Sequence, residues 1–130
     1  MKFVFLVFFV SSFLCFTLLA KDIFIKASAK IYNNDIFEAK ERVLKNAKLK
    51  AVKKGVEIFL VKKTINDNYQ AIKEQIYNLN QNFIKNFEIV YQDIDLDQPY
   101  IEVQIKANVA KGKIKQKLKN LGILHDRMGY

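Results

Sequence analysis

The sequence predicts an α+β fold: a three-stranded, mainly antiparallel sheet with two long helices on one face, followed by a short basic C-terminal helix. Residues 23–32 and 101–109 alternate between apolar and polar side chains, and residues 87–92 follow the same period of two, as half-buried strands do. Residues 35–60 and 66–83 carry apolar residues at helical spacing. The order strand, helix, helix, strand, strand suits a layered domain, in which two helices are enough to cover the apolar face of the sheet.

The first strand and the first helix are bounded by turn and capping signals. The strand at residues 23–32 has a predicted inward face made of every second residue, namely Ile23, Ile25, Ala27, Ala29 and Ile31. Asn33 and Asn34 indicate a turn after it. Asp35 and Glu38 form a capping pair three residues apart, so we expect the helix to begin there.

A stripe of small residues runs along the first helix at every fourth position, formed by Ala39, Val43, Ala47, Ala51 and Gly55. Small side chains let a helix axis lie close to a sheet, and a bulky replacement would overpack the contact. The end of this helix has two interpretations. Either it continues through Gly55 to about Leu60, or it breaks at Gly55 and Val56–Val61 form a strand.

The second long helix is predicted to start near Asn66 or Asp67. Five apolar residues then follow at alternating spacings of three and four, namely Tyr69, Ile72, Ile76, Leu79 and Phe83. This stripe would lie on the sheet beside the first helix.

A hairpin and a basic tail complete the predicted domain. The strands at 87–92 and 101–109 are joined by a polar tip, Asp93–Pro99, so we expect them to pair antiparallel. From Ala110 onward, leucine and isoleucine recur at helical spacing between lysines, and Gly122 is a plausible end for this short helix.

Size and composition limit the classes of protein. The chain has 130 residues and a net charge of +9, so it forms one small domain, and a multidomain enzyme is excluded. It is 51% hydrophobic with 1 Cys and 1 Pro. These values exclude a disulfide scaffold, a collagen and a disordered low-complexity chain.

Residues 1–20 have the pattern of a secretory signal peptide. A positive start precedes an apolar run over residues 3–19, and Ala20 is the small residue expected before a cleavage site. We expect cleavage after Ala20 and a periplasmic location, with an uncleaved inner-membrane anchor as the alternative. We interpret Cys15 as an ordinary apolar residue, because the bulky residues before it do not suit lipoprotein processing.

The residues predict no catalytic, cofactor or metal site. His125 is the single histidine, and no cysteine or second histidine accompanies it in the tail to complete a metal set or a nucleophile–base pair. Glu88 and Glu102 are the carboxylates that the hairpin would bring together in space, and we interpret them as lining the polar face of the sheet. No glycine-rich phosphate loop is present.

Three aspartates at the hairpin tip resemble the start of a calcium loop. Asp93, Asp95 and Asp97 have its spacing, but Gln98 occupies the position of its glycine and Gln104 that of its bidentate glutamate. We therefore interpret them as a solvated tip.

Three segments resemble the N-terminal domain of flagellar assembly protein T. They are Ala39–Val52 with the strand before it, Phe83–Val90, and Val103–Val109, and the resemblance extends over Phe24–Val109. It implies an exported, periplasmic, non-catalytic module that takes part in a ring around the flagellar basal body. The domain organisation expected is then a signal peptide at 1–20, this domain at 21–110, and a basic helix and tail at 111–130.

Two kinds of surface residue are predicted to bind partners. Aromatic residues anchor protein contacts, and those expected on the outward side of the strands are Phe24, Tyr32 and Tyr100. A basic helix can lie on an anionic membrane surface, and the lysines that would do so are Lys111, Lys113, Lys115, Lys117 and Lys119.

These features predict a protein-interaction or structural module of the periplasm, with protein partners that include flagellar basal-body components. The alternative function is a peripheral membrane or envelope-polymer binder that acts through the basic helix. Nucleic acid is disfavoured as a partner, because aromatic residues do not alternate with the lysines.

Overall fold

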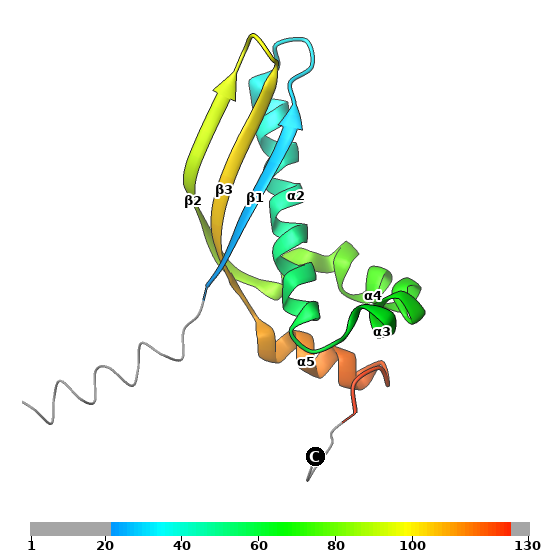
Figure 1. Cartoon of the computed structure of the whole chain (residues 1–130). Coiled ribbons are helices and arrows are strands. Elements are labelled where there is room, and N and C mark those ends of the chain that lie inside the picture. Colours follow the sequence, from blue (N-terminus) through cyan, green and yellow to red (C-terminus); the bar gives the residue numbers. More distant parts are fainter. Residues whose placement is uncertain (1–21, 126–130) are drawn as a thin grey trace, which may run out of the picture.

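An antiparallel sheet with β3 at its centre organises the part of the chain that the computed structural model describes, residues 22–125 (Figure 1). The elements in chain order are β1 (Ile23–Lys30), α2 (Ile36–Glu57), α3 (Lys62–Asp67), α4 (Tyr69–Gln75), the 3₁₀ helix η1 (Tyr77–Phe83), β2 (Ile84–Asp95), β3 (Tyr100–Val109) and α5 (Lys111–Asn120). β3 pairs antiparallel with β1 on one side and with β2 on the other, so β1 and β2 are the edges. The predicted α+β class and the three-stranded antiparallel sheet are confirmed.

The turn before α2 and its N-terminal cap are as predicted. Asn33 and Asn34 have φ values of 54° and 59°, in the left-handed region that asparagine tolerates better than most residues. The Asp35 side chain accepts a hydrogen bond of 3.0 Å from the backbone N–H of Glu38. This bond satisfies one of the four backbone donors that a helix leaves unpaired at its start.

Replacing Asp35 by alanine is expected to lower the free energy of unfolding by about 1 kcal/mol, because the Glu38 N–H loses its acceptor. Urea unfolding followed by circular dichroism measures the change. Glu41→Ala, on the exposed surface of the same helix, is the matched control and should change stability by less than about 0.5 kcal/mol. Equal effects of the two changes would show that the cap does not stabilise the fold.

Small residues let α2 pack closely against the inner face of the sheet. α2 contacts β1 and β3, and Ala39, Val43, Ala47 and Ala51 are fully buried. The alternate residues of β3 that face α2 are also buried, namely Ile101, Val103, Ile105, Ala107 and Val109. The predicted role of the small stripe in packing is therefore confirmed.

α2 continues through Gly55 and ends at Glu57, so residues 56–61 form no strand. Val56 is fully buried in the last turn, whereas Val61 is 71% exposed. A Cβ on Gly55 would lie 2.7 Å from Cδ1 of Ile114 and 3.0 Å from Cγ1 of Val109. Gly55 thus lies at a close approach of α5 and the end of β3 to α2.

The prediction of a second long helix is wrong. The chain forms α3, α4 and η1 instead, because the backbone leaves helical geometry at Asn68 (φ −118°, ψ 22°) and again at Ile76 (φ −126°, ψ −58°). The predicted stripe is divided accordingly: Ile72 is fully buried, but Tyr69 and Leu79 are exposed. The short helices gather near the Glu57 end of α2. Among the described helices, α2 is the one that runs along the sheet (Figure 1).

The basic helix α5 is part of the same core. Ile114 and Leu118 are fully buried, and α5 contacts α2 and η1. Gly122 has a φ of 73°, and its N–H donates to the carbonyl of Lys119 at 3.0 Å. The predicted end of the helix is confirmed, and α5 belongs to the packed domain rather than to a separate basic appendage.

Candidate functional site

The outward face of the sheet carries ion pairs, and Asp93 is the carboxylate that lies opposite Glu102 in the register of β2 and β3. Lys26 Nζ lies 3.6 Å from Glu102 Oε1, and Lys106 Nζ lies 3.8 Å from Asp22 Oδ2. Glu88 of β2 lies opposite Lys106 of β3. Lys106 is four residues, or about 13 Å, along β3 from Glu102. The hairpin therefore keeps Glu88 and Glu102 apart, and the sequence-based pairing of these two residues is corrected.

Of the three aspartates predicted to form the hairpin tip, Asp93 lies within β2, and Asp95, the last residue of β2, organises the turn. Asp95 Oδ1 accepts hydrogen bonds from the backbone N–H groups of Asp97 at 3.0 Å and Gln98 at 3.1 Å, as aspartates in turns commonly do. Within residues 22–125, no group of three or more histidine, cysteine, aspartate or glutamate side chains is placed to hold a metal ion. His125 is exposed at the end of this range.

The three aromatic residues predicted as interface anchors do not form one patch. Phe24 is 58% exposed near the start of β1 and Tyr32 is 57% exposed just beyond its end, about 26 Å away along the strand. The Arg42 guanidinium lies 5.0 Å from the centre of the Tyr32 ring. Tyr100 is only partly buried at the start of β3, where desolvation and nearby carboxylates raise its pKa.

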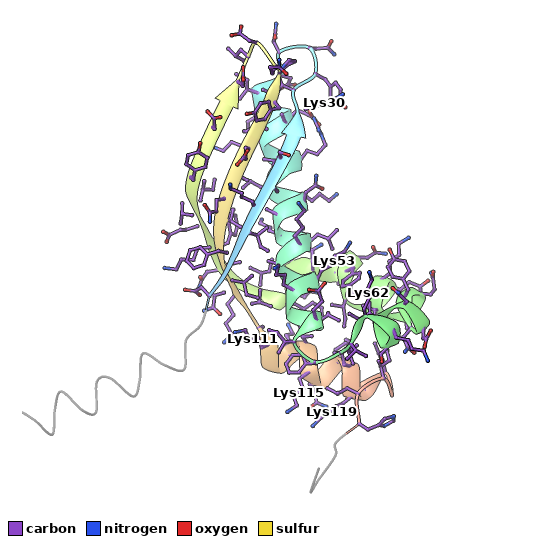
Figure 2. The ribbon with its side chains drawn as sticks, viewed as in Figure 1. Lys30, Lys53, Lys62, Lys111, Lys115 and Lys119 are labelled. Atoms are coloured by element: carbon purple, nitrogen blue, oxygen red, sulfur yellow. The ribbon has the colours of Figure 1, made fainter. Side chains whose placement is uncertain are left out.

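The five lysines of α5 occupy two flanks of the helix (Figure 2). Lys111, Lys115 and Lys119 follow one another at four-residue spacing on one flank, and Lys113 and Lys117 do so on the other. The helix therefore presents charge on both sides of its buried stripe.

The apolar side of α5 is used inside the protein. Ile114 and Leu118 are fully buried, and Lys113 Nζ donates to the Asn82 carbonyl at 2.8 Å. A helix that lies in a membrane interface buries its apolar face among the lipids. An anionic surface would therefore meet α5 through its lysine charges and not through an inserted apolar face.

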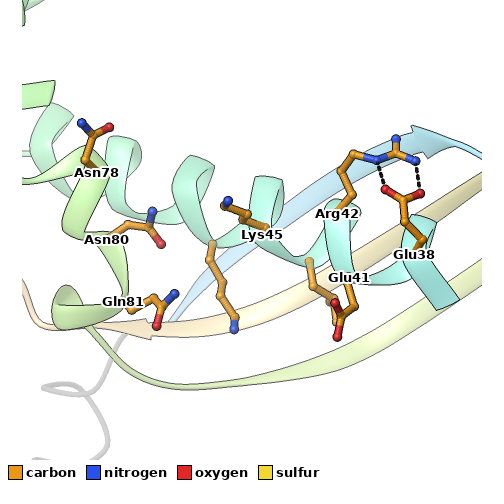
Figure 3. A pocket seen from close by; sticks show the side chains of 9 residues that line it. Glu38, Glu41, Arg42, Lys45, Asn78, Asn80 and Gln81 are labelled. Carbon is orange, nitrogen blue, oxygen red and sulfur yellow. Dashed lines mark hydrogen bonds and ion pairs between the residues drawn. The ribbon is translucent and has the colours of Figure 1, made fainter.

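A groove follows the exposed side of α2 and reaches the first residues of β2, and η1 closes one end of it. Figure 3 shows its larger part. It consists of adjoining pockets of about 620 and 340 Å³ that share Lys48 and Gln81. The larger is lined by Glu38, Glu41, Arg42, Leu44, Lys45, Lys48, Asn78, Asn80 and Gln81, and the smaller by Lys48, Gln81, Ile84, Lys85, Asn86 and Phe87. We call this surface, together with the adjacent inner face of β2, the α2–β2 groove.

The groove exists because one helix cannot cover three strands. Strands lie about 4.8 Å apart and a helix is about 10 Å across, so one helix covers about two strands. α2 contacts β1 and β3, and the inner face of β2 is left partly uncovered. On that face Phe87, Ile89 and Ile94 are partly buried and Gln92 is exposed.

The charges along the groove are mainly positive. Lys45, Lys48 and Lys85 line it, and Lys48 Nζ lies 4.2 Å from the centre of the Phe87 ring, a favourable contact between a cation and an aromatic face. Of the two glutamates, Glu38 accepts hydrogen bonds of 2.9 and 2.7 Å from Arg42. That hydrogen bonding lowers the pKa of Glu38 and raises the pKa of Arg42, so both groups remain charged.

The opposite edge of the sheet is tied to α2. Arg42 donates to the carbonyl of Lys30 at 2.9 Å, and Lys50 donates to the carbonyl of Lys26 at 3.3 Å. Side chains of α2 thus cover part of the β1 edge.

Comparison with known proteins does not assign a family. A scan of family models found none that matches the chain, and a search of curated proteins found no match. The resemblance to flagellar assembly protein T stays a prediction. Of the helices within residues 22–125, none is long and apolar enough to cross a membrane, and the predicted signal peptide at 1–20 lies outside the described residues.

Sequence reasoning missed the α2–β2 groove because it placed a second helix there. One signal was present: Lys40, Leu44 and Lys48 form a row one position after the small stripe, and so share one flank of the helix. A single leucine between two lysines is too weak a pattern to predict a binding surface.

Proposed function

We propose that this chain is an exported, non-catalytic module that binds other proteins in the periplasm and assembles at the flagellar basal body. The observation that carries the binding role is the α2–β2 groove, where apolar residues of β2 lie partly exposed beside α2. Exposed apolar surface with a polar rim is typical of interaction sites.

The remaining parts of the proposal have separate support. Residues 1–20 have a signal-peptide pattern, which supports export. The resemblance over Phe24–Val109 supports a place at the flagellar basal body. Glu38 and Glu102 are engaged in ion pairs and Asp95 in a turn, so these carboxylates have structural roles, which supports a binding protein over an enzyme.

Co-purification tests the proposed location. An epitope-tagged copy, expressed at its native level, is expected to be enriched with detergent-extracted flagellar basal bodies. A strain that lacks basal bodies is the control, and the enriched fraction should disappear from it. Recovery of the tagged protein only in the soluble periplasm would remove the flagellum from the proposal.

A second proposal, favoured by the two lysine flanks of α5, is attachment to an anionic envelope surface. Because the apolar side of α5 is buried, this attachment would be electrostatic and would weaken as salt shortens the screening length to about 3 Å at 1 M. Washing isolated envelopes with salt separates the two proposals. Release by salt supports attachment through the lysines, and retention supports an apolar protein contact.

A further inference from the structure

We infer that the α2–β2 groove binds an amphipathic helix of a partner protein, and that this helix carries acidic residues beside its apolar stripe. The inference rests on the proposed protein-binding function and deepens it, since it names the surface and the chemistry of the partner. The occupant would lie where a second helix was expected on the sheet.

The dimensions of the uncovered strand face suit a helix. Phe87, Ile89 and Ile94 point to the inner side of the sheet, in register with core residues of β3. Phe87 and Ile94 are seven steps apart along the strand, about 23 Å at 3.3 Å per residue, which a helix of about 15 residues matches at 1.5 Å per residue. A helix in this position would pack against β2 and the flank of α2 that carries Leu44.

The edge of β2 is a poorer site for an added strand. The pairing of β2 with β3 is irregular between Ile84 and Asn86 and again between Ile89 and Tyr91. Such irregularities twist an edge strand and interrupt the row of backbone groups that an incoming strand would pair with. The face of β2 is therefore favoured over its edge, and a helix over an extended peptide.

Charge selects an acidic partner. The α2 row beside β2 consists of Lys40, Leu44 and Lys48, with Lys45 on the outer rim. Of the two glutamates that line the groove, Glu38 is paired with Arg42, and Glu41 is the other. The chain as a whole has a net charge of +9. Complementary charge speeds association and fixes the orientation of a bound helix, so aspartate or glutamate beside an apolar stripe fits this rim.

Two adjacent exposed residues of β2 allow a matched test. Gln92 faces the inner side of the sheet and Asp93 the outer side, and both are exposed, so a photocrosslinking amino acid at each position samples opposite faces. In native cells, the probe at Gln92 is expected to attach to one partner segment, and the probe at Asp93 is not. The attachment sites should recur every three or four residues on a segment with flanking acidic residues.

Charge reversal gives a quantitative readout on folded protein. The crosslinked segment, made as a synthetic peptide, should bind at least about tenfold more weakly to a Lys45→Glu, Lys48→Glu double variant. Lys50→Glu with Lys53→Glu is the matched control, because these two lysines line a pocket on the β1 side of α2. Like Lys48, Lys53 lies over an aromatic ring, that of Tyr77 at 5.3 Å. The control variant should bind as the unmodified protein does.

Several results would overturn the inference. They are equal crosslinking from Gln92 and Asp93, crosslinking from neither, attachment to a segment without helical spacing or acidic flanks, and equal loss of binding in both lysine double variants. Failure of the proposed function is distinguishable from these results. If the tagged chain is enriched with basal bodies but Gln92 makes no crosslink, the proposed function stands and only the groove assignment fails.

Discussion

Leu118→Ala is expected to lower the free energy of unfolding by about 2–5 kcal/mol, because it removes a fully buried side chain and leaves a cavity in the core. Single domains have a total stability of about 5–15 kcal/mol, so the loss would be a large fraction of the whole. Urea unfolding of the mature chain, followed by circular dichroism, measures it.

Lys115→Ala is the matched control for this prediction. Lys115 is exposed in the same helix, and its replacement should change stability by less than about 0.5 kcal/mol. If Leu118→Ala cost less than about 1 kcal/mol, α5 would be a loosely attached tail, since that is well below the usual cost of truncating a buried leucine. Its apolar side would then be available to a membrane, and attachment of α5 would no longer be limited to its lysine charges.

Gly55→Val is expected to destabilise the protein by about 1–3 kcal/mol through overpacking. Even the first carbon of a new side chain would lie 2.7 Å from Ile114 and 3.0 Å from Val109, and both of these residues are buried. The expected result is a lower urea midpoint with an unchanged slope, as a loss of stability without a change of fold requires.

Gly112, in α5, supplies the control for this change. A Cβ on Gly112 would have no heavy atom within 4 Å, so Gly112→Val meets no packing obstacle and should leave the urea midpoint nearly unchanged. If Gly55→Val and Gly112→Val destabilised the protein equally, glycine at position 55 would be required for a reason other than the close approach of α5.

The correct predictions share a local origin. The alternation in β1 and β3 identified the inward faces, because successive side chains of a strand point to opposite sides. Asp35 and Gly122 marked helix ends, because capping depends on backbone groups within a few residues of the cap. None of these features requires knowledge of distant parts of the chain.

The wrong prediction has a different origin. Apolar residues from Tyr69 to Phe83 recur at spacings of three and four residues, but this spacing does not require a continuous helix. Breaks at Asn68 and Ile76 divide the segment, and its buried residues join the core at the end of α2. Periodicity shows which residues are apolar on one side, and the packing partners decide where the backbone bends.

The amino-acid sequence by itself determined the inward faces of β1 and β3, the start of α2, its small packing stripe and the excess of positive charge. Only the tertiary structure decided which apolar surfaces are covered: Ile114 and Leu118 of the basic helix are buried, while Phe87 and Ile89 of β2 remain partly open. Coverage depends on the widths of the elements, because a helix about 10 Å across reaches two strands of a three-stranded sheet. That geometry arises when distant segments pack together, and it leaves the α2–β2 groove as the candidate binding surface.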